Sequence, residues 1–93
     1  MPTLDNVLAV APNVVARESE DELVVVLPEA GDFFVLNGTG AEVFRLVDGE
    51  RTLGEVAGAL HARYGDVDLR RIQADVLAFA EKIIDKAAVR VQR

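Results

Sequence analysis

Few side chains in this sequence have the type and spacing that catalysis requires. The only serine, Ser19, lies in a charged turn, and the only histidine, His61, follows forty-two residues later within a predicted helix. Nucleophilic catalysis needs a hydroxyl or thiol beside a base, and these two residues do not form such a pair. His61 also lacks the histidine or cysteine companions of a zinc site. We therefore expect no enzyme activity, no catalytic residue and no metal site.

The glycines and the clustered carboxylates lack the context of a cofactor site. Gly38, Gly40, Gly49 and Gly54 lie close together, but neither a Gly-Lys-Ser/Thr sequence nor a strand-Gly-x-Gly-x-x-Gly-helix pattern accompanies them. Their placement is typical of turns and helix caps. The acidic run over residues 18–22 is typical of a solvated turn. We therefore expect no bound cofactor, and a function in binding.

Length and composition predict one folded domain over residues 1–93, with its core between about residues 12 and 86 and with frayed ends. Apolar residues make up 51% of the chain and are spread along it. A chain this short hides only part of its surface on folding, which favours a shallow groove over a deep cleft. The sequence has no cysteine, no secretion signal and no apolar run of the about 18 residues that a membrane span needs. These features favour a cytoplasmic protein that does not bind membranes.

The net charge of −6 is unevenly distributed. Residues 1–67 hold four arginines and twelve carboxylates, whereas residues 68–93 hold six basic residues and four carboxylates. An acidic domain repels the phosphate backbone, so nucleic acid is not an expected partner. The last predicted helix is the basic part of the chain. It would attract an acidic peptide segment within a Debye length of about 8 Å.

Three strand signals come first in the chain. Val14 to Arg17 is short and β-branched, Leu23 to Leu27 is a continuous apolar run, and Phe33 to Leu36 is a third run that ends at Asn37-Gly38. Polar turn residues separate the three runs. The pattern predicts a three-stranded antiparallel meander.

Three helices are predicted to follow the strands. Thr39-Gly40-Ala41-Glu42 and Thr52-Leu53-Gly54-Glu55 both match the capping box, which marks a helix start. They predict helices over residues 41–47 and 53–64. Asp66 or Asp68 then caps a third helix that runs to about Lys86. The predicted fold class is α+β, with a three-stranded antiparallel sheet followed by three helices.

The third helix carries an apolar arc roughly 160° wide, whereas one core contact requires about 100°. Such an arc either packs on several neighbours or leaves a part of itself for a ligand, and both interpretations stay open. Phe79 lies at one border of the arc, next to charged residues. The arc consists of Leu69, Ile72, Val76, Leu77, Phe79, Ala80, Ile83 and Ile84.

The order of these residues resembles the PqqD family of peptide chaperones, also called RiPP recognition elements. Pro12 and Arg17 near the first strand contribute to the resemblance, which covers roughly residues 12–84. The chain departs from the family after residue 83, where Ile84-Asp85-Lys86-Ala87-Ala88 replaces the family's usual Leu and Gly-Leu. The more specific pieces are Gly31-x-Phe33-Phe34-x-Leu36-Asn37-x-Thr39-Gly40-Ala41, Leu46-x-Asp48-Gly49-x-Arg51-Thr52 and Asp75-Val76-x-x-Phe79.

The resemblance implies a winged-helix-like domain that binds the leader segment of a ribosomally made precursor peptide and presents it to a modifying enzyme. In the family the leader adds as a strand beside the third strand, in the cleft with the third helix. The enzyme partner would be a radical SAM protein of PQQ or modified-peptide biosynthesis, or the protease and cyclase of lasso peptide biosynthesis. The matching positions are Asp32, Phe33, Phe34, Val35 and Leu36 on the strand and Arg71, Ile72, Asp75, Val76, Phe79, Lys82 and Ile83 on the helix.

Alternation along the third strand places Phe34 with Leu36 on one face and Phe33 with Val35 on the other. Because Leu36 abuts the first helix, we expect Phe34 to face the core and Phe33 and Val35 to lie nearer the open side. An unpaired edge with two aromatic residues is an aggregation risk unless something covers it. The pattern therefore favours a strand edge that binds a partner.

Two other functions fit parts of the sequence. A winged-helix DNA-binding regulator would present Arg70 and Arg71, at the start of the third helix, to a groove. The net charge of −6 argues against it, as do Asp68 and Asp75 on the same helix. A structural dimerisation module would join two copies through the edge at residues 33–36, and such a homodimer is compatible with peptide binding. Salt-dependent binding of a duplex, or a dimer in sedimentation, would distinguish these functions.

Overall fold

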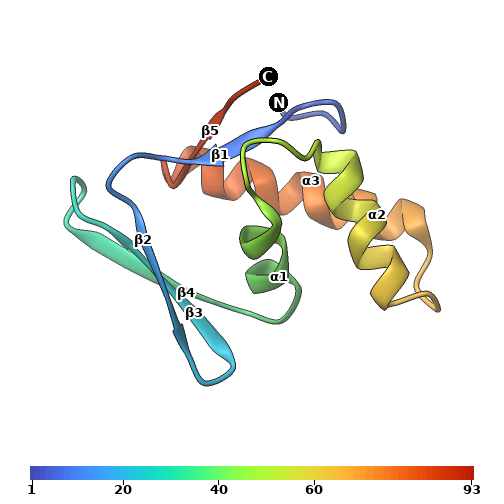
Figure 1. Ribbon diagram of the computed structural model, residues 1–93, viewed down its shortest axis with the longest axis horizontal. Coiled ribbons are helices and arrows are strands. Elements are labelled where there is room, and N and C mark those ends of the chain that lie inside the picture. The colour runs from blue at the N-terminus through green and yellow to red at the C-terminus, as the bar shows by residue number, and fades with distance from the viewer.

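A computed structural model describes the whole chain, residues 1–93, and contains an antiparallel meander of three strands (Figure 1). The strands are β2 (Val15–Ser19), β3 (Glu22–Leu27) and β4 (Asp32–Asn37), in the spatial order β2-β3-β4. All three lie within two residues of their predicted bounds, so this part of the prediction is confirmed. Gly31 has a φ of 66° in the turn between β3 and β4, a conformation that glycine adopts without strain.

The three predicted helices are also present, as α1 (Gly38–Leu46), α2 (Leu53–Arg63) and α3 (Leu69–Asp85). At the start of α2 the capping box forms: the Glu55 amide donates to the Thr52 hydroxyl at 3.0 Å, and the Thr52 amide donates to the Glu55 carboxylate at 2.8 Å. At the start of α3 the Asp68 carboxylate accepts from the Arg70 amide. None of these helices combines the length and the apolar character that crossing a bilayer demands.

The capping box predicted at Thr39 and Glu42 is wrong. Helix α1 begins at Gly38, with Asn37 as its N-cap, so Thr39 lies inside the first turn and cannot cap it. The Glu42 carboxylate instead accepts a hydrogen bond from Tyr64 at the end of α2. The local pattern predicts that the Glu42 side chain caps the start of α1. In the structure it bonds to α2 instead.

The expectation of frayed ends is also wrong. Two further strands, β1 (Leu8–Val10) and β5 (Val89–Val91), pair antiparallel and bring the two ends of the chain side by side (Figure 1). Leu8 is 1% exposed and Val89 is 3% exposed, so the hydrophobic core extends beyond residues 12–86. The amide of Val7 also donates to the carbonyl of Arg93 at 2.9 Å.

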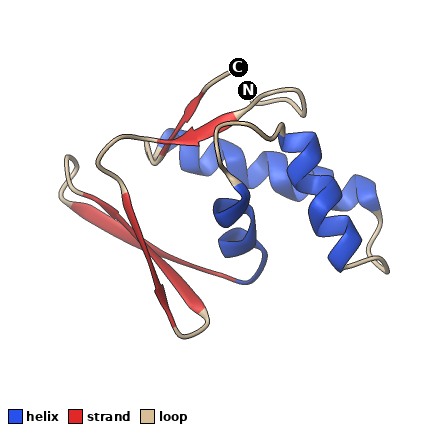
Figure 2. Ribbon diagram, viewed as in Figure 1, coloured by secondary structure: helices blue, strands red, loops and turns tan.

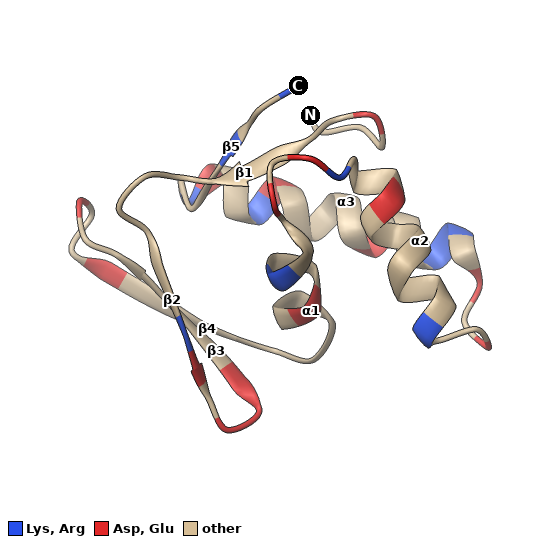
Figure 3. Cartoon of the chain, in the orientation of Figure 1, with Lys and Arg blue, Asp and Glu red and all other residues tan.

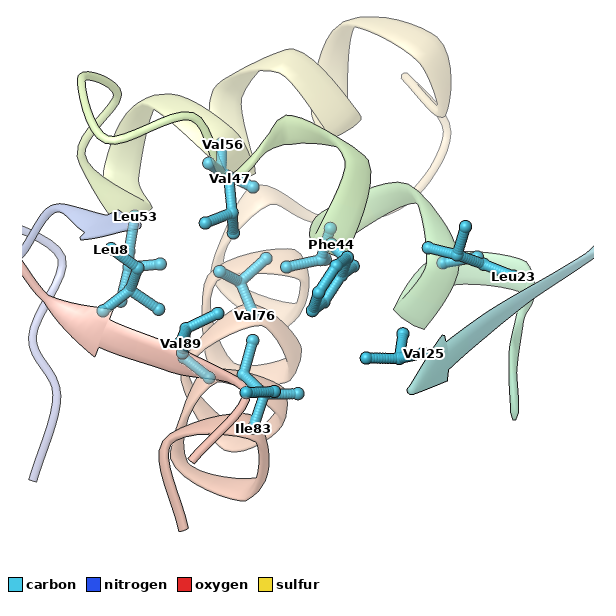
Figure 4. Close-up of a cluster of buried hydrophobic side chains, with 14 of the residues drawn as sticks. Leu8, Leu23, Val25, Phe44, Val47, Leu53, Val56, Val76, Ile83 and Val89 are labelled. Carbon is cyan, nitrogen blue, oxygen red and sulfur yellow. The ribbon is translucent and has the colours of Figure 1, made fainter. Parts of the chain in front are cut away.

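The core lies where the helices, the β1–β5 pair and the inner face of the meander meet (Figure 2 and Figure 4). Val25 of β3 and Phe44 of α1 point toward each other in this core, and Val76 of α3 lies between α1 and β5 (Figure 4). The apolar arc of α3 therefore packs on several neighbours. Its buried members are Ile72, Val76, Ala80 and Ile83.

Candidate functional site

The edge of β4 that faces away from β3 has no partner strand. β3 is the only neighbour of β4 in the sheet, and α1 continues directly from its end. The backbone amides and carbonyls along such an edge can pair with another extended chain. The outer edge of β2 is free in the same way. What distinguishes β4 from β2 is the helix beside it.

Contacts at two positions show that β4 and the start of α1 run antiparallel to α3. Near the beginning of β4, the Lys86 ammonium lies 5.4 Å from the centroid of the Phe34 ring. Further along, Gly40 touches the Phe79 ring so closely that a Cβ at position 40 would lie 3.1 Å from the ring carbon Cε1. As the chain advances from Phe34 to Gly40, it therefore moves from the C-terminal end of α3 toward its middle.

A pocket of about 420 Å³ lies beyond the end of β4, in line with the space between β4 and α3. Gly38 and Thr39 form one side, and the first two turns of α3 form the other through Arg71, Ile72 and Asp75. The remaining wall comes from the last turn of α2 and the loop that follows it, through Leu60, Tyr64 and Val67. Its lining is apolar at the base, with one ion pair at the rim, where Arg71 Nε lies 3.9 Å from Asp75 Oδ2.

The pocket's tyrosine is held by a neighbouring carboxylate. Tyr64 donates its hydroxyl proton to Glu42 Oε1 at 2.7 Å, and this hydrogen bond raises the pKa of Tyr64. Arg63 approaches the same oxygen at 3.6 Å. The second oxygen of Glu42 is buried and has no hydrogen-bond partner. The cluster fixes the end of α2 against α1, which shapes one wall of the pocket.

A second, smaller pocket of about 200 Å³ lies near the opposite end of β4. The turn between β3 and β4 forms one side of it through Pro28, Glu29 and Ala30, and the chain after α3 forms the other through Lys86 and Arg90. Lys82 is an exposed residue one turn earlier on α3. Together with Lys86 and Arg90 it makes the region near the beginning of β4 basic.

The register of the sheet settles which face of β4 each side chain occupies. Phe34 lies opposite Val25 and Leu36 lies opposite Leu23, both of which are buried, so Phe34 and Leu36 face inward as predicted. Phe33 is 63% exposed and Val35 is 45% exposed on the other face of the sheet. That face points away from the core. The carboxylate of Asp32 accepts from the Phe33 amide at 2.8 Å.

The residues predicted on α3 divide into two groups. Arg71, Asp75 and Lys82 are exposed, and Phe79 is half-buried against Gly40. Val76 and Ile83 are 0% and 1% exposed, because the wide apolar arc packs on the core, and a bound peptide would not touch them. Ile72 is 7% exposed but lines the 420 Å³ pocket, so it remains within reach of a ligand.

Sequence reasoning missed several residues of the larger pocket, namely Gly38, Thr39, Leu60, Tyr64 and Val67. The only sequence signal for Leu60 and Tyr64 as neighbours is their spacing, which places them on the same side of α2. The position of Val67 depends on how the loop between α2 and α3 folds, which no local pattern encodes. No group of three or more histidine, cysteine, aspartate or glutamate side chains gathers anywhere in the structure to hold a metal ion.

The meander, the three helices and the free edge of β4 beside α3 define a small α+β domain, and comparisons with known proteins identify its family. The family model for coenzyme PQQ synthesis protein D (PqqD) matches residues 22–89. The chain belongs to the PqqD family, as the sequence resemblance predicted. It is 36% identical over 63 residues to the PqqA binding protein of Stutzerimonas stutzeri (strain A1501), a match that covers 68% of this chain and 64% of the relative's length.

Solved structures of related domains share the fold. The solution structure of the PqqD truncation of Methylobacterium extorquens PqqCD, described as a stand-alone RiPP recognition element, superposes with a TM-score of 0.81 at 27% identity, covering 97% of this chain and 95% of that one. TbiB1 in complex with the TbiA(beta) leader peptide has a TM-score of 0.80 at 23% identity, over 87% of this chain and 93% of that one. Lasso peptide synthetase B1 complexed with its leader peptide has a TM-score of 0.80 at 17% identity, over 89% and 96%.

Proposed function

We propose that this domain binds the leader segment of a ribosomally made precursor peptide, by adding the leader as a strand to the free edge of β4, and delivers it to a modifying enzyme. The observation that carries the proposal is the unpaired edge of β4 lying along α3, with a pocket beyond its end. Main-chain hydrogen bonds to the edge would provide affinity, and side-chain pockets would provide selectivity. The names of the PqqA binding protein and of the two leader-bound structures support the ligand class.

The side chains around the edge suggest what the leader presents. Side chains alternate between the two faces of a strand, so every second leader residue would point toward α3, beside Phe34 and Phe79. The 420 Å³ pocket at the end of β4 has a base lined by Leu60 and Ile72 and suits an apolar leader residue. Lys82 and Lys86 at the other end would attract acidic leader residues.

The domain would act as an adaptor without chemistry of its own. Its partner enzyme would be the radical SAM enzyme of PQQ or related peptide biosynthesis, or the protease and cyclase of a lasso peptide pathway. A DNA-binding function is disfavoured, because the chain carries a net charge of −6 and Asp75 lies 3.9 Å from Arg71 near the start of α3.

A backbone N-methyl scan of the leader peptide encoded beside this gene tests the proposal. Methylation removes one amide donor at a time and keeps every side chain, so strand addition predicts losses of affinity at alternate positions only. Fluorescence anisotropy with the labelled leader would measure each dissociation constant, with a scrambled leader as the control for nonspecific binding. We expect losses of tenfold or more with a period of two. Losses that follow side-chain identity, with no such period, would exclude strand addition.

A further inference from the structure

The meander has an apolar face that neither the helices nor the proposed leader site uses. Register places Val15, Val26 and Phe33 in one row across the three strands, and Arg17, Val24 and Val35 in the next. Residues directly opposite each other in antiparallel strands share a face. We call these six residues the outer sheet face.

No element of the chain covers the outer sheet face. All helices lie on the other side of the meander, where α1 packs on β3 and β4 (Figure 2). Phe33 is 63% exposed, and Val15 and Val35 are each 45% exposed. Contiguous exposed apolar residues are often found at interaction sites.

Acidic residues lie next to the outer sheet face at the end of the meander formed by the turn between β2 and β3 (Figure 3). Glu20, Asp21 and Glu22 lie at the turn between β2 and β3. Asp32 lies opposite the buried Leu27, and Glu29 lines the 200 Å³ pocket beside Lys86, so neither belongs to this border. Arg17 is the only cation on the face. Glu18 does not add to this border, because its side chain points to the inner face and pairs with Arg45 of α1 at 2.7 Å. The face is thus an apolar patch with a negative border.

This charge pattern argues against a second copy of the chain as the occupant. Two such faces stacked on each other would bring together the acidic residues of two chains, with one arginine from each chain to offset them. The area limits the strength of contact with any partner: at about 3.3 Å per residue and about 4.8 Å between strands, three short strands cover roughly 250 Å². A stable interface buries about 800 Å² on each partner. A weak, basic partner fits better than a self-association.

We infer that the outer sheet face is the docking surface for the modifying enzyme, through an apolar patch with a basic border on that enzyme. The inference rests on the proposed leader binding at the edge of β4 and assigns the enzyme to the opposite face of the same sheet. Enzyme and leader would then occupy the domain together without competing. A leader strand added to β4 would widen the docking surface, because its outward side chains would continue the rows of Phe33 and Val35.

The test compares Val15→Lys with a matched control, Val91→Lys. Val15 lies on β2, on the far side of the sheet from the proposed leader site, and Val91 is a similarly exposed valine on β5 (45% and 51%). The probe is the purified modifying enzyme encoded beside the precursor-peptide gene. We expect Val15→Lys to weaken enzyme binding at least tenfold and to leave the melting temperature and the dissociation constant of the labelled leader unchanged. Val91→Lys should change none of the three.

A second variant tests the border. Glu20→Lys with Asp21→Lys should also weaken enzyme binding, and the remaining affinity should depend less on salt concentration. Enzyme affinity that is unchanged in both variants would overturn the inference, even if the leader binds as proposed. Enzyme affinity is measured without leader. A leader that fails to bind the wild type would therefore overturn the proposed function and not this inference. A dimer of the free domain in sedimentation that Val15→Lys dissociates would assign the face to a second copy and overturn the inference.

Discussion

The Lys86 ammonium lies over the Phe34 ring, 5.4 Å from its centroid, and this contact joins the end of α3 to the beginning of β4. A cation over an aromatic face is attracted to it, by about 0.5–1 kcal/mol at an exposed site. The contact positions the Phe34 ring beside α3, where the proposed leader strand would run.

Charge reversal of Lys82 should weaken leader binding. Lys82 is exposed on the last turn of α3 and makes no ion pair within the chain, so its charge is available to an acidic leader residue. We expect Lys82→Glu to raise the leader's dissociation constant several-fold and to flatten its dependence on salt. Arg93→Glu, an equal charge change at the far end of the chain, is the control. Equal affinity and equal salt dependence in the wild type and Lys82→Glu would contradict the predicted role.

Alanine should stabilise the domain at position 58 but not at position 40. Both glycines are helical, and Gly→Ala in a helix normally stabilises a protein by about 0.5–1 kcal/mol. A Cβ at Gly58 would meet nothing within 4 Å, whereas one at Gly40 would lie 3.1 Å from the Phe79 ring. We therefore expect chemical denaturation to show the gain for Gly58→Ala and not for Gly40→Ala. In a Phe79→Ala background, Gly40→Ala should become stabilising; a gain already present in the wild-type background would show that the ring moves freely.

The paired ends of the chain should contribute to global stability. Leu8 is 1% exposed in the core, and removal of a buried leucine side chain typically costs about 2–5 kcal/mol. We expect Leu8→Ala to lower the free energy of unfolding by an amount in this range in urea denaturation. Val10→Ala, two residues away and 39% exposed, should change it by less than about 0.5 kcal/mol. Similar small effects of both variants would mean that β1 frays.

The ion pair between Glu18 and Arg45 should make stability depend on acid pH. Two hydrogen bonds of 2.7 Å from the Arg45 guanidinium hold the pKa of Glu18 below its usual 4.5. A group whose pKa is depressed in the folded state contributes stability that is present above its unfolded pKa and is lost as pH falls through its folded pKa. We expect the wild type to lose stability relative to Glu18→Gln below about pH 4.5, and not between about pH 6 and 8.

Arg45→Gln provides the second arm of that experiment. Without the guanidinium, Glu18 has no partner, so Glu18→Gln in the Arg45→Gln background should leave the pH dependence of the melting temperature unchanged. The pair is exposed, so the effect should be small and should shrink with added salt. A pH difference between wild type and Glu18→Gln that persists without Arg45 would assign it to another contact.

Local patterns predicted the elements whose signals lie within a few residues. The apolar run at residues 23–27 and the capping box at Thr52 and Glu55 act over short distances and formed as predicted. The same capping pattern failed at Thr39, where Glu42 bonds to Tyr64 of another helix. β1 and β5 were missed for a related reason. Each has three residues, and their pairing joins segments about eighty positions apart.

At the candidate site, too, local patterns predicted some features, and contacts between distant segments decided the others. Alternation along β4 correctly separated the face of Phe34 from the face of Phe33. The width of the α3 arc did not reveal which of its residues the core would bury, because that depends on α2, β5 and α1 together. Val76 and Ile83 were for this reason expected at the site and lie in the core. The pocket beyond the end of β4 arises from three elements that meet only in the folded chain.

The measurement that tests the central claim most directly is an isotope-filtered NOE experiment on the labelled domain with its unlabelled leader peptide. Strand addition to β4 predicts cross-strand NOEs from the leader backbone to the amides of residues 32–37, together with side-chain NOEs to Phe34 and Phe79. It also predicts no contact with the outer edge of β2, residues 15–19. Leader NOEs to β2, or to helix side chains with none to the β4 amides, would contradict the account.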